Sequence, residues 1–254
     1  MKITVLGCGS SGGVPLINGH WGQCDPTNRR NYRTRASLWV QHDNKSLIID
    51  TGYDFREQAL RQKIERVDGV IYTHEHEDHV VGIGELRVFY FLQRQPIPIY
   101  GSLKTISALQ KRFYFLFQQH PQADGLYPKV VEPIVVEDEF NAAGLPMRVF
   151  RQDHGFIESY GVRIGNFAYS TDVVRLDEAA FAALEGVDVW IVDALRRDPR
   201  PAHSHLEQTL AWIERVKPKQ AYLTHMDESM DYETLCRELP ANVAPAYDGL
   251  EIEI

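Results

Sequence analysis

The sequence contains few cysteines, and the three that it has are far apart. Cys8, Cys24 and Cys236 stand among 254 residues, and no two of them form a C-x-x-C pair. A disulfide framework needs more cysteines at closer spacing, and a zinc ribbon or a thioredoxin-like redox motif needs that pair. The few, scattered cysteines therefore argue against a disulfide-stabilised fold, a zinc ribbon and a cysteine redox site.

The chain also lacks long apolar runs and an excess of positive charge. No segment has the length of apolar sequence that spans a bilayer. The start, "MKITVLGCGSSGG", has neither the apolar core nor the cleavage site of a signal peptide. The net charge of −8 provides no basic field for nucleic acid. We therefore expect a cytoplasmic protein without a membrane partner; the charge argues against nucleic acid as a partner, and a homodimer is possible.

What the sequence does contain is a series of strand-like runs. Hydrophobic residues make up 44% of the chain, which is enough for a sizeable core. Helical patterns occur at residues 102–119, 176–186 and 204–218, the last with a Ser204–Glu207 capping box. We predict one domain over residues 1–254, a layered α/β fold with two sheets, and an exposed loop at 120–129. The strand-like runs are residues 2–7, 35–42, 46–52, 68–74, 97–102, 131–138, 147–154, 160–165, 166–172, 187–194, 220–225 and 247–254.

The glycine pattern that follows the first strand-like run, residues 2–7, does not indicate a dinucleotide-binding site. Gly7, Gly9 and Gly12 have the spacing G-x-G-x-x-G. Such a site needs a helix that begins at these glycines, but Pro15 and a polar, irregular stretch follow. The glycines instead predict a tight loop in which backbone segments approach closely.

The segment "THEHEDH", residues 73–79, concentrates histidines and carboxylates directly after an apolar run. His74 and His76 are two residues apart, so both can project from the same side of an extended chain. Asp78 and His79 follow in a turn and can point to a neighbouring position. These donors suit Zn²⁺, Mn²⁺ or Fe²⁺. The segment predicts one loop that supplies two adjacent metal ions; a polar, solvated turn is the alternative.

Further donors end three other apolar runs. His154 ends "FRQDH", Asp172 ends "FAYSTD" and His225 ends "AYLTH". A single such residue is usually a buried histidine or an aspartate that caps a helix. Several at the ends of apolar strands predict a common site, because one short loop cannot complete two metal shells.

The order H-x-H-x-D-H, then a distant His, an Asp and a His, resembles the metallo-β-lactamase superfamily over essentially the whole chain. That resemblance implies an α/β fold, a four-layer αβ/βα sandwich with two divalent ions, Zn²⁺ or Mn²⁺, at one edge between two sheets. Asp50 in "LIIDTG" matches an aspartate that orients a ligand histidine; a plain turn aspartate is the alternative. The implied ligands are His74, His76 and His154 for one ion, Asp78, His79 and His225 for the other, and Asp172 as the bridge.

Other stretches are similar to one branch of that superfamily. "THEHEDHVVGIGELRVF", "IPIYG", "AHSHLEQTL", "YLTHM" and "YDGLEI" look like the phosphonate-pathway phosphodiesterases that open phosphoribosyl cyclic phosphate, a branch near tRNase Z. In that branch a histidine near "AHSH" acts in catalysis. This implies His203, with His205 as the weaker candidate and a solvated loop histidine as the alternative. The structural zinc of the branch is not expected, because only Cys24 remains of its cysteines and Glu228 replaces its histidine.

These residues together predict a dinuclear phosphodiesterase for a small cyclic or nucleotide-like phosphodiester. Two ions lower the pKa of a bound water toward ~7 and so supply hydroxide. Asp78 belongs to this catalytic centre, and His203 protonates the departing alkoxide. The alternatives are hydrolysis of a thioester, lactone or lactam at the same ions, and tRNase Z-like RNA processing. Candidates to bind a phosphorylated substrate, unless they form ordinary surface ion pairs, are Arg29, Arg30, Arg33 and Arg35.

Overall fold

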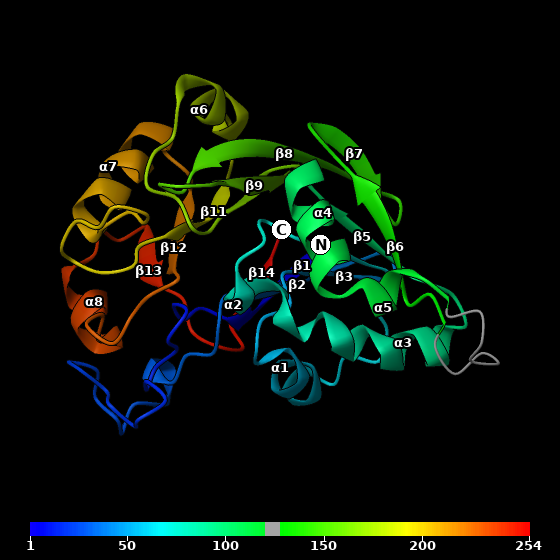
Figure 1. The fold of residues 1–254 in the computed structure, drawn as a ribbon. Helices are drawn as coiled ribbons and strands as arrows, with labels where there is room; N and C mark the ends of the chain where they lie inside the picture. The colour runs from blue at the N-terminus through cyan, green and yellow to red at the C-terminus, as the bar shows by residue number, and fades with distance from the viewer. Residues whose placement is uncertain (120–127) are drawn as a thin grey trace.

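The computed structural model describes residues 1–119 and 128–254, and in it the chain builds two seven-stranded sheets (Figure 1). Most of the loop predicted at 120–129 lies outside the described residues. In spatial order, the first sheet contains β14 (Glu251–Glu253), β1 (Lys2–Gly7), β2 (Ser37–His42), β3 (Lys45–Ile49), β4 (Gly69–Ile71), β5 (Ile97–Gly101) and β6 (Val131–Val135). The second contains β13 (Val243–Pro245), β12 (Gln220–Thr224), β11 (Val189–Asp193), β10 (Phe167–Ser170), β9 (Glu158–Ile164), β8 (Leu145–Asp153) and β7 (Glu139–Ala142).

Helices cover the outer faces of the two sheets. The connections of the first sheet carry α1 (Phe55–Gln62), α2 (Glu77–Val80), α3 (Leu86–Gln93), α4 (Leu103–Arg112) and α5 (Tyr114–Phe117). Those of the second sheet carry α6 (Glu178–Leu184), α7 (Leu206–Val216) and α8 (Tyr232–Glu238). Two short 3-10 turns, η1 (Arg29–Asn31) and η2 (Val81–Glu85), complete the described elements. The order helix, sheet, sheet, helix confirms the predicted four-layer sandwich.

Alternating side chains of the first sheet divide between two apolar clusters. In β3, Leu47 and Ile49 pack in the cluster shared with the second sheet, whereas Ile48 packs in the cluster beneath α1, α3 and α4. Successive residues of a strand point to opposite faces, so a strand that is apolar throughout must be covered on both sides. This explains why the inner strands read as continuous apolar runs.

Each predicted strand-like run contains a strand, but the other elements agree less well. The short strands β7 and β13 were not predicted. The helix predicted at 102–119 is broken at Phe113, where the backbone leaves the helical region, and the carbonyl of Leu116 accepts the Val130 N–H at 2.7 Å. The predicted capping box is also wrong, because α7 begins after His205 and the Ser204 hydroxyl donates to the carbonyl oxygen of Asp193 at 2.7 Å.

The glycine-rich segment after β1 forms a tight loop, as predicted, and no helix begins there. The N–H of Gly9 donates to the carbonyl of Thr34 at 2.8 Å. A Cβ atom on Gly7 would lie 2.2 Å from the carbonyl oxygen of Arg35, and one on Gly9 would lie 2.9 Å from that of Arg33. The glycines are therefore required because two backbone segments approach each other closely, and not because a pyrophosphate does.

The strands leave several carboxyl ends at one edge of the sandwich. β3 and β4 run parallel, and so do β10, β11 and β12. Asp50, Asp172 and His225 each follow one of these strands, with left-handed φ angles of 63°, 53° and 57°. Residues other than glycine rarely adopt such angles, and they persist where the surrounding structure holds them, often at functional sites.

Candidate metal centre

All seven predicted metal ligands gather at this edge, and their donor atoms form close groups. The described residues contain three groups in which one donor atom of each member lies within 4.8 Å of the others. The groups are His74, His76, His154 and Asp172; Asp78, His79 and His225; and Asp172, His203 and His225. The first sheet supplies the donors of the "THEHEDH" segment, and the second sheet supplies the rest, so the centre lies between the two sheets.

The "THEHEDH" segment is held in place by the "DTG" turn that follows β3. The carbonyl of His79 accepts the N–H of Thr51 at 2.7 Å, and the N–H of Gly82 donates to the carbonyl of Thr51 at 2.8 Å. A Cβ atom on Gly52 would lie 2.0 Å from the carbonyl oxygen of Asp78. Only glycine permits this contact, which fixes the short helix α2 and the donors that it carries.

Asp172 lies between the two main groups and turns one oxygen to each. Its Oδ1 lies 3.8 Å from His74 Nε2 and 3.5 Å from His154 Nε2. Its Oδ2 lies 3.1 Å from His79 Nε2 and 3.4 Å from His225 Nε2. A carboxylate with histidine nitrogens on both sides has the geometry of a bridge between two cations.

The buried histidine nitrogens fit a metal better than they fit the protein alone. His74 Nε2, His79 Nε2 and His225 Nε2 are buried without a hydrogen-bond partner. Buried polar atoms are nearly always paired, so three such atoms facing one carboxylate need an explanation. Neutral imidazoles together with carboxylates are the donor set of Zn²⁺ and similar divalent ions. The residues therefore fit divalent metal ions.

In His79 and His154 the opposite ring nitrogen, Nδ1, is engaged, which directs the Nε2 of each toward the centre. His79 Nδ1–H donates to Asp50 Oδ2 at 2.7 Å, and His154 Nδ1–H donates to the carbonyl of Ala202 at 2.6 Å. Asp50 is itself fixed by two hydrogen bonds of 2.8 Å, from the N–H and the hydroxyl of Thr73. Such partners select the tautomer and the orientation of a metal-binding imidazole.

The carboxylates of the centre stay ionised. Burial raises the pKa of Asp172, but the neighbouring His225, His79 and His74 lower it further, so that it lies well below its usual value. The pKa of Asp78 is likewise lowered, because His79 and His225 outweigh the effect of burial. The centre therefore presents negative oxygens to a cation over the whole neutral range of pH.

His203 lies beside the metal donors and is held there by a hydrogen bond to a residue outside the predicted ligand set. Its Nδ1–H donates to Asp193 Oδ2 at 3.0 Å, and its Nε2 lies 3.9 Å from Asp172 Oδ1. Burial lowers the pKa of His203, but Asp193 and then Asp172 and Asp78 raise it to about 9. Asp193 ends β11 and was not singled out in the sequence, although it ends an apolar strand as the predicted ligands do. His203 therefore points a protonated Nε2 at the centre.

Three of the four arginines predicted to bind substrate contact other residues of the chain. The guanidinium of Arg33 is buried and donates to the carbonyls of Asp227 and Met230 at 3.2 and 2.6 Å, so it holds the loop after β1 and does not face a substrate. Arg30 stacks on the ring of Tyr232, and Arg35 pairs with Asp54 at 3.1 Å.

The remaining sequence predictions fall outside the donor groups. His205 is the N-cap residue of α7 and belongs to none of the three groups. Arg29 lies in η1, and its role as a substrate ligand stays a prediction. No helix among the described residues is long and apolar enough to cross a membrane.

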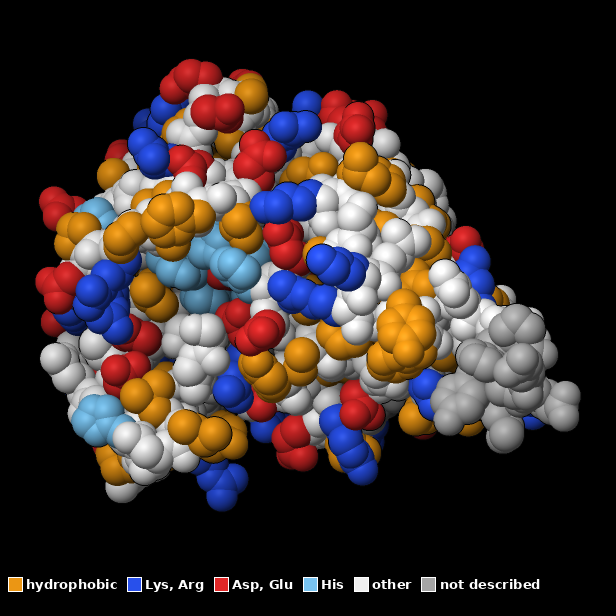
Figure 2. All heavy atoms as spheres, viewed as in Figure 1, with side chains coloured by type: hydrophobic (Ala, Val, Ile, Leu, Met, Phe, Trp, Pro, Cys, Tyr) orange, Lys and Arg blue, Asp and Glu red, His pale blue; other side chains and the backbone are white. Residues whose placement is uncertain are grey.

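On the surface the histidines lie at the bottom of a hollow (Figure 2). Cationic and apolar side chains stand on its rim in that view. Glu75, between two of the ligands, pairs with Lys104 at 3.0 Å, and its carbonyl accepts a hydrogen bond from Arg112 at 2.6 Å. The centre is therefore accessible from solvent although most of its ligands are buried.

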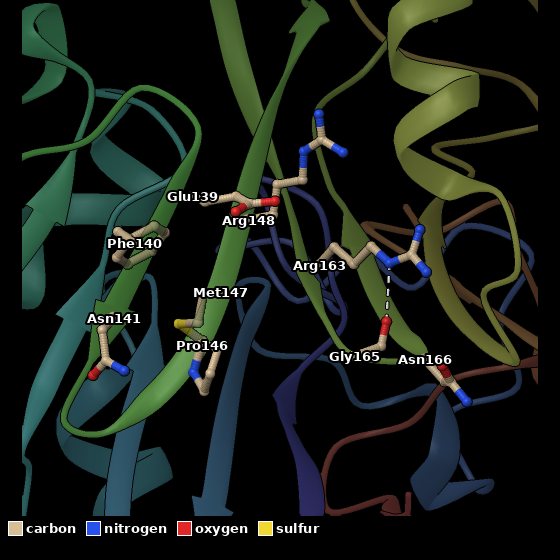
Figure 3. A pocket seen from close by; sticks show the side chains of 9 residues that line it. All are labelled: Glu139, Phe140, Asn141, Pro146, Met147, Arg148, Arg163, Gly165 and Asn166. Atoms are coloured by element: carbon tan, nitrogen blue, oxygen red, sulfur yellow. Dashed lines mark hydrogen bonds between the residues drawn. The ribbon is translucent and has the colours of Figure 1, made fainter.

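A second concavity lies on the exposed side of β7, β8 and β9 and has a volume of about 660 Å³ (Figure 3). It contains none of the donors described above. Its cations are engaged, because Arg148 pairs with Asp138 at 2.9 Å and Arg163 donates to the carbonyl of Gly165 at 2.9 Å. It is not part of the candidate centre. The side chains that line it are Glu139, Phe140, Asn141, Pro146, Met147, Arg148, Arg163, Gly165 and Asn166.

Comparisons with known proteins agree with this arrangement. Residues 45–226 match the family model described as the beta-lactamase superfamily domain. A solved structure, a diphosphatase from the PhnP family, is 35% identical, covers 100% of this chain and 96% of its own, and superposes with a TM-score of 0.90. The Zn²⁺-bound PqqB of Methylobacterium extorquens is 19% identical, covers 100% of both chains, and has a TM-score of 0.80, which shows a shared fold.

A curated relative matches nearly the whole chain but is much longer. The octanoyltransferase of Porphyromonas gingivalis is 30% identical over 254 residues, which are 99% of this chain and 51% of that protein. The chain thus spans about half the length of this relative, and 29%, 32% and 43% of three other curated relatives that it matches.

Proposed function

The chain belongs to the β-lactamase superfamily, and from that premise we propose that it is a metal-dependent phosphodiesterase. It holds two divalent ions, zinc or manganese, and hydrolyses a small cyclic or nucleotide-like phosphodiester. His74, His76 and His154 hold one ion, Asp78, His79 and His225 hold the other, and Asp172 bridges them. Asp50 fixes the ring of His79 behind the second ion.

The observation that carries this proposal is the position of Asp172. Each of its oxygens faces a different pair of histidine nitrogens, 3.1 to 3.8 Å away. The two sets also belong to separate donor groups, one around His74, His76 and His154 and the other around Asp78, His79 and His225, so each set suits an ion of its own. Two ions at such a site activate a water and neutralise charge that develops on a phosphoryl oxygen.

His203 supports hydrolysis of an ester with a poor leaving group. An alkoxide or ribose oxygen must be protonated as it departs, and a group within reach that holds a proton at neutral pH can do this. Asp193 keeps His203 protonated, with a pKa of about 9, and points its Nε2 into the centre. The similarity to the solved diphosphatase from the PhnP family also favours attack at phosphorus.

A thioester hydrolase is the second candidate, because a relative that matches 99% of this chain, over 51% of its own length, is named an octanoyltransferase. A thiolate leaves without protonation more easily than an alkoxide does, so this reaction would not need the Asp193–His203 pair. The presence of that pair favours the phosphodiesterase. RNA processing is disfavoured by the net charge of −8.

The test compares two diesters that differ in the leaving group. The protein is loaded with Zn²⁺ or Mn²⁺. The nitrophenyl diester is methyl p-nitrophenyl phosphate, and the alkyl diester is dimethyl phosphate or a ribose cyclic phosphate. An octanoyl thioester tests the second candidate function. His203→Ala should keep its metal content and lose roughly 10² to 10⁴ in turnover on the alkyl diester. The loss should be smaller on the nitrophenyl diester, whose leaving group needs little protonation.

His205→Ala, two residues away in the chain, is the matched control and should behave as the wild type does. An equal loss on both diesters would assign His203 to binding or to the metal site, as would a loss of metal in His203→Ala. Faster hydrolysis of the thioester than of every diester would favour the second candidate.

A further inference from the structure

We propose that the groove beside the metal centre binds the base of a nucleotide, and that Phe156 stacks against it. This inference rests on the proposed phosphodiesterase function and identifies the substrate as a diester that carries a nucleoside. The groove has a volume of about 710 Å³. Its lining residues are Lys104, Arg151, Gln152, Asp153, Gly155, Phe156, Ile157, Glu158, Arg175, Leu176 and Asp177.

Phe156 is exposed to solvent and lies close in the chain to the proposed metal ligand His154. Its side chain is 94% exposed, and it lies two residues after His154. The turn is tight, because the N–H of Phe156 donates to the carbonyl of His154 at 3.1 Å and the N–H of His154 donates to that of Ile157 at 2.9 Å. An aromatic ring left in water on a fixed turn at the mouth of a site is a surface for another flat ring.

Each side of the groove includes a residue that adjoins the metal ligands. On one side Asp153 and Gly155 flank the ligand His154 in the chain. On the other side Lys104 pairs at 3.0 Å with Glu75, which lies between two ligands of the "THEHEDH" segment. Adjacent Cα atoms are about 3.8 Å apart. The groove therefore adjoins the ligands on both sides, and we infer that a substrate with its phosphate on the ions places its next ring there.

The charge of the groove fits a base better than it fits a further phosphate. Lys104, Arg151 and Arg175 are balanced by Asp153, Glu158 and Asp177, which gives no net charge. Arg175 also pairs with Asp153 at 3.0 Å. A groove that continued along a nucleic-acid backbone would have an excess of cations. Paired donors and acceptors around an apolar ring instead suit the polar edge and the flat face of one base.

The experiment uses two substrates with the same leaving group. Methyl p-nitrophenyl phosphate and thymidine 5′-(p-nitrophenyl phosphate) release the same nitrophenolate, so they differ only in the nucleoside. The wild type should have the lower KM for the thymidine ester. Phe156→Ala should raise that KM roughly 5- to 100-fold, in keeping with the loss of one base–aromatic stack, and leave the methyl ester within about twofold.

Two further variants separate stacking from other effects. Phe156→Trp should keep the low KM for the thymidine ester, because a larger ring still stacks. Ile17→Ala is the matched control, since Ile17 is a fully exposed apolar side chain in the loop between β1 and β2. It should leave both substrates unchanged.

A binding measurement keeps this inference separate from the proposed function. Calorimetry with thymidine 5′-monophosphate and with inorganic phosphate should show tighter binding of the nucleotide, and Phe156→Ala should remove the difference. If neither diester is hydrolysed but this difference is found, the proposed function fails and the base site stands. If Phe156→Ala changes both diesters equally, or changes neither and leaves nucleotide binding intact, the base site is refuted.

Discussion

Replacing Asp193 by asparagine should move the alkaline limit of activity to lower pH. The carboxylate accepts the Nδ1–H of His203 at 3.0 Å, and the pKa of His203 is about 9 against 6.5 for a free imidazole. This difference corresponds to about 3 kcal/mol in favour of the imidazolium. Without the charge of Asp193, burial still lowers the pKa and only the more distant Asp172 and Asp78 still raise it, so we expect the pKa of His203 to fall back to about the 6.5 of a free imidazole.

The sign of the effect follows from the role of the proton. His203 acts in its protonated form, so activity is present below its pKa and is lost as the pH rises through it. At pH 8 the protonated fraction would fall from about 90% to about 3%, a loss of roughly 30-fold, whereas at pH 6 the loss would be less than about twofold.

The assay is the pH profile of kcat/KM on an alkyl diester, with metal content measured at each end of the range. Folding should be preserved, because Ser204 and Thr209 donate to the backbone carbonyl of Asp193, which the substitution leaves in place. Asp153→Asn, which removes a charge next to His154, is the control and should not move the limit. An Asp193→Asn profile with the alkaline limit still near 9 would refute the reasoning.

Three more predictions test the metal centre itself. Asp172→Ala should reduce bound metal from two ions per chain to one or none by elemental analysis; no more than one ion in undepleted wild type would contradict the dinuclear proposal. Cys24→Ser should leave metal content unchanged and alter the free energy of unfolding by less than about 1 kcal/mol, whereas loss of one zinc would reveal a further site. Gly52→Ala should weaken metal binding at least about tenfold in chelator competition, because its Cβ would overlap the carbonyl of Asp78; Gly84→Ala, with nothing within 4 Å, should not.

The donors could be predicted from the sequence because three of them end apolar strands and the other four lie together in one segment that follows a fourth strand. Carboxyl ends of parallel strands meet at one edge, so a local pattern carries long-range information. Asp193 follows the same rule at the end of "VWIVD", and the rule alone would have found it. The carbonyl of Ala202, which orients His154, could not be predicted, since a backbone acceptor leaves no signal in the sequence.

The failures share a different cause. Ser204 and Glu207 form a capping box by local pattern, but the Ser204 hydroxyl donates to the carbonyl of Asp193. The sequence predicts Arg33 as one of a cluster of anion-binding arginines, but its guanidinium donates hydrogen bonds to backbone carbonyls nearly 200 positions away. In both cases a distant buried acceptor determines the hydrogen bond, and residues near in the sequence do not reveal it.

The division of the donors between the two sheets has a consequence for how the protein matures. During synthesis the chain emerges from its N-terminus, so the "THEHEDH" donors leave the ribosome long before Asp172 and His225 do. A nascent first sheet then offers His74, His76, Asp78 and His79 without the shared carboxylate. We expect tight loading with metal to wait until the second sheet has folded against the first, so that uptake of the ions marks the docking of the two sheets.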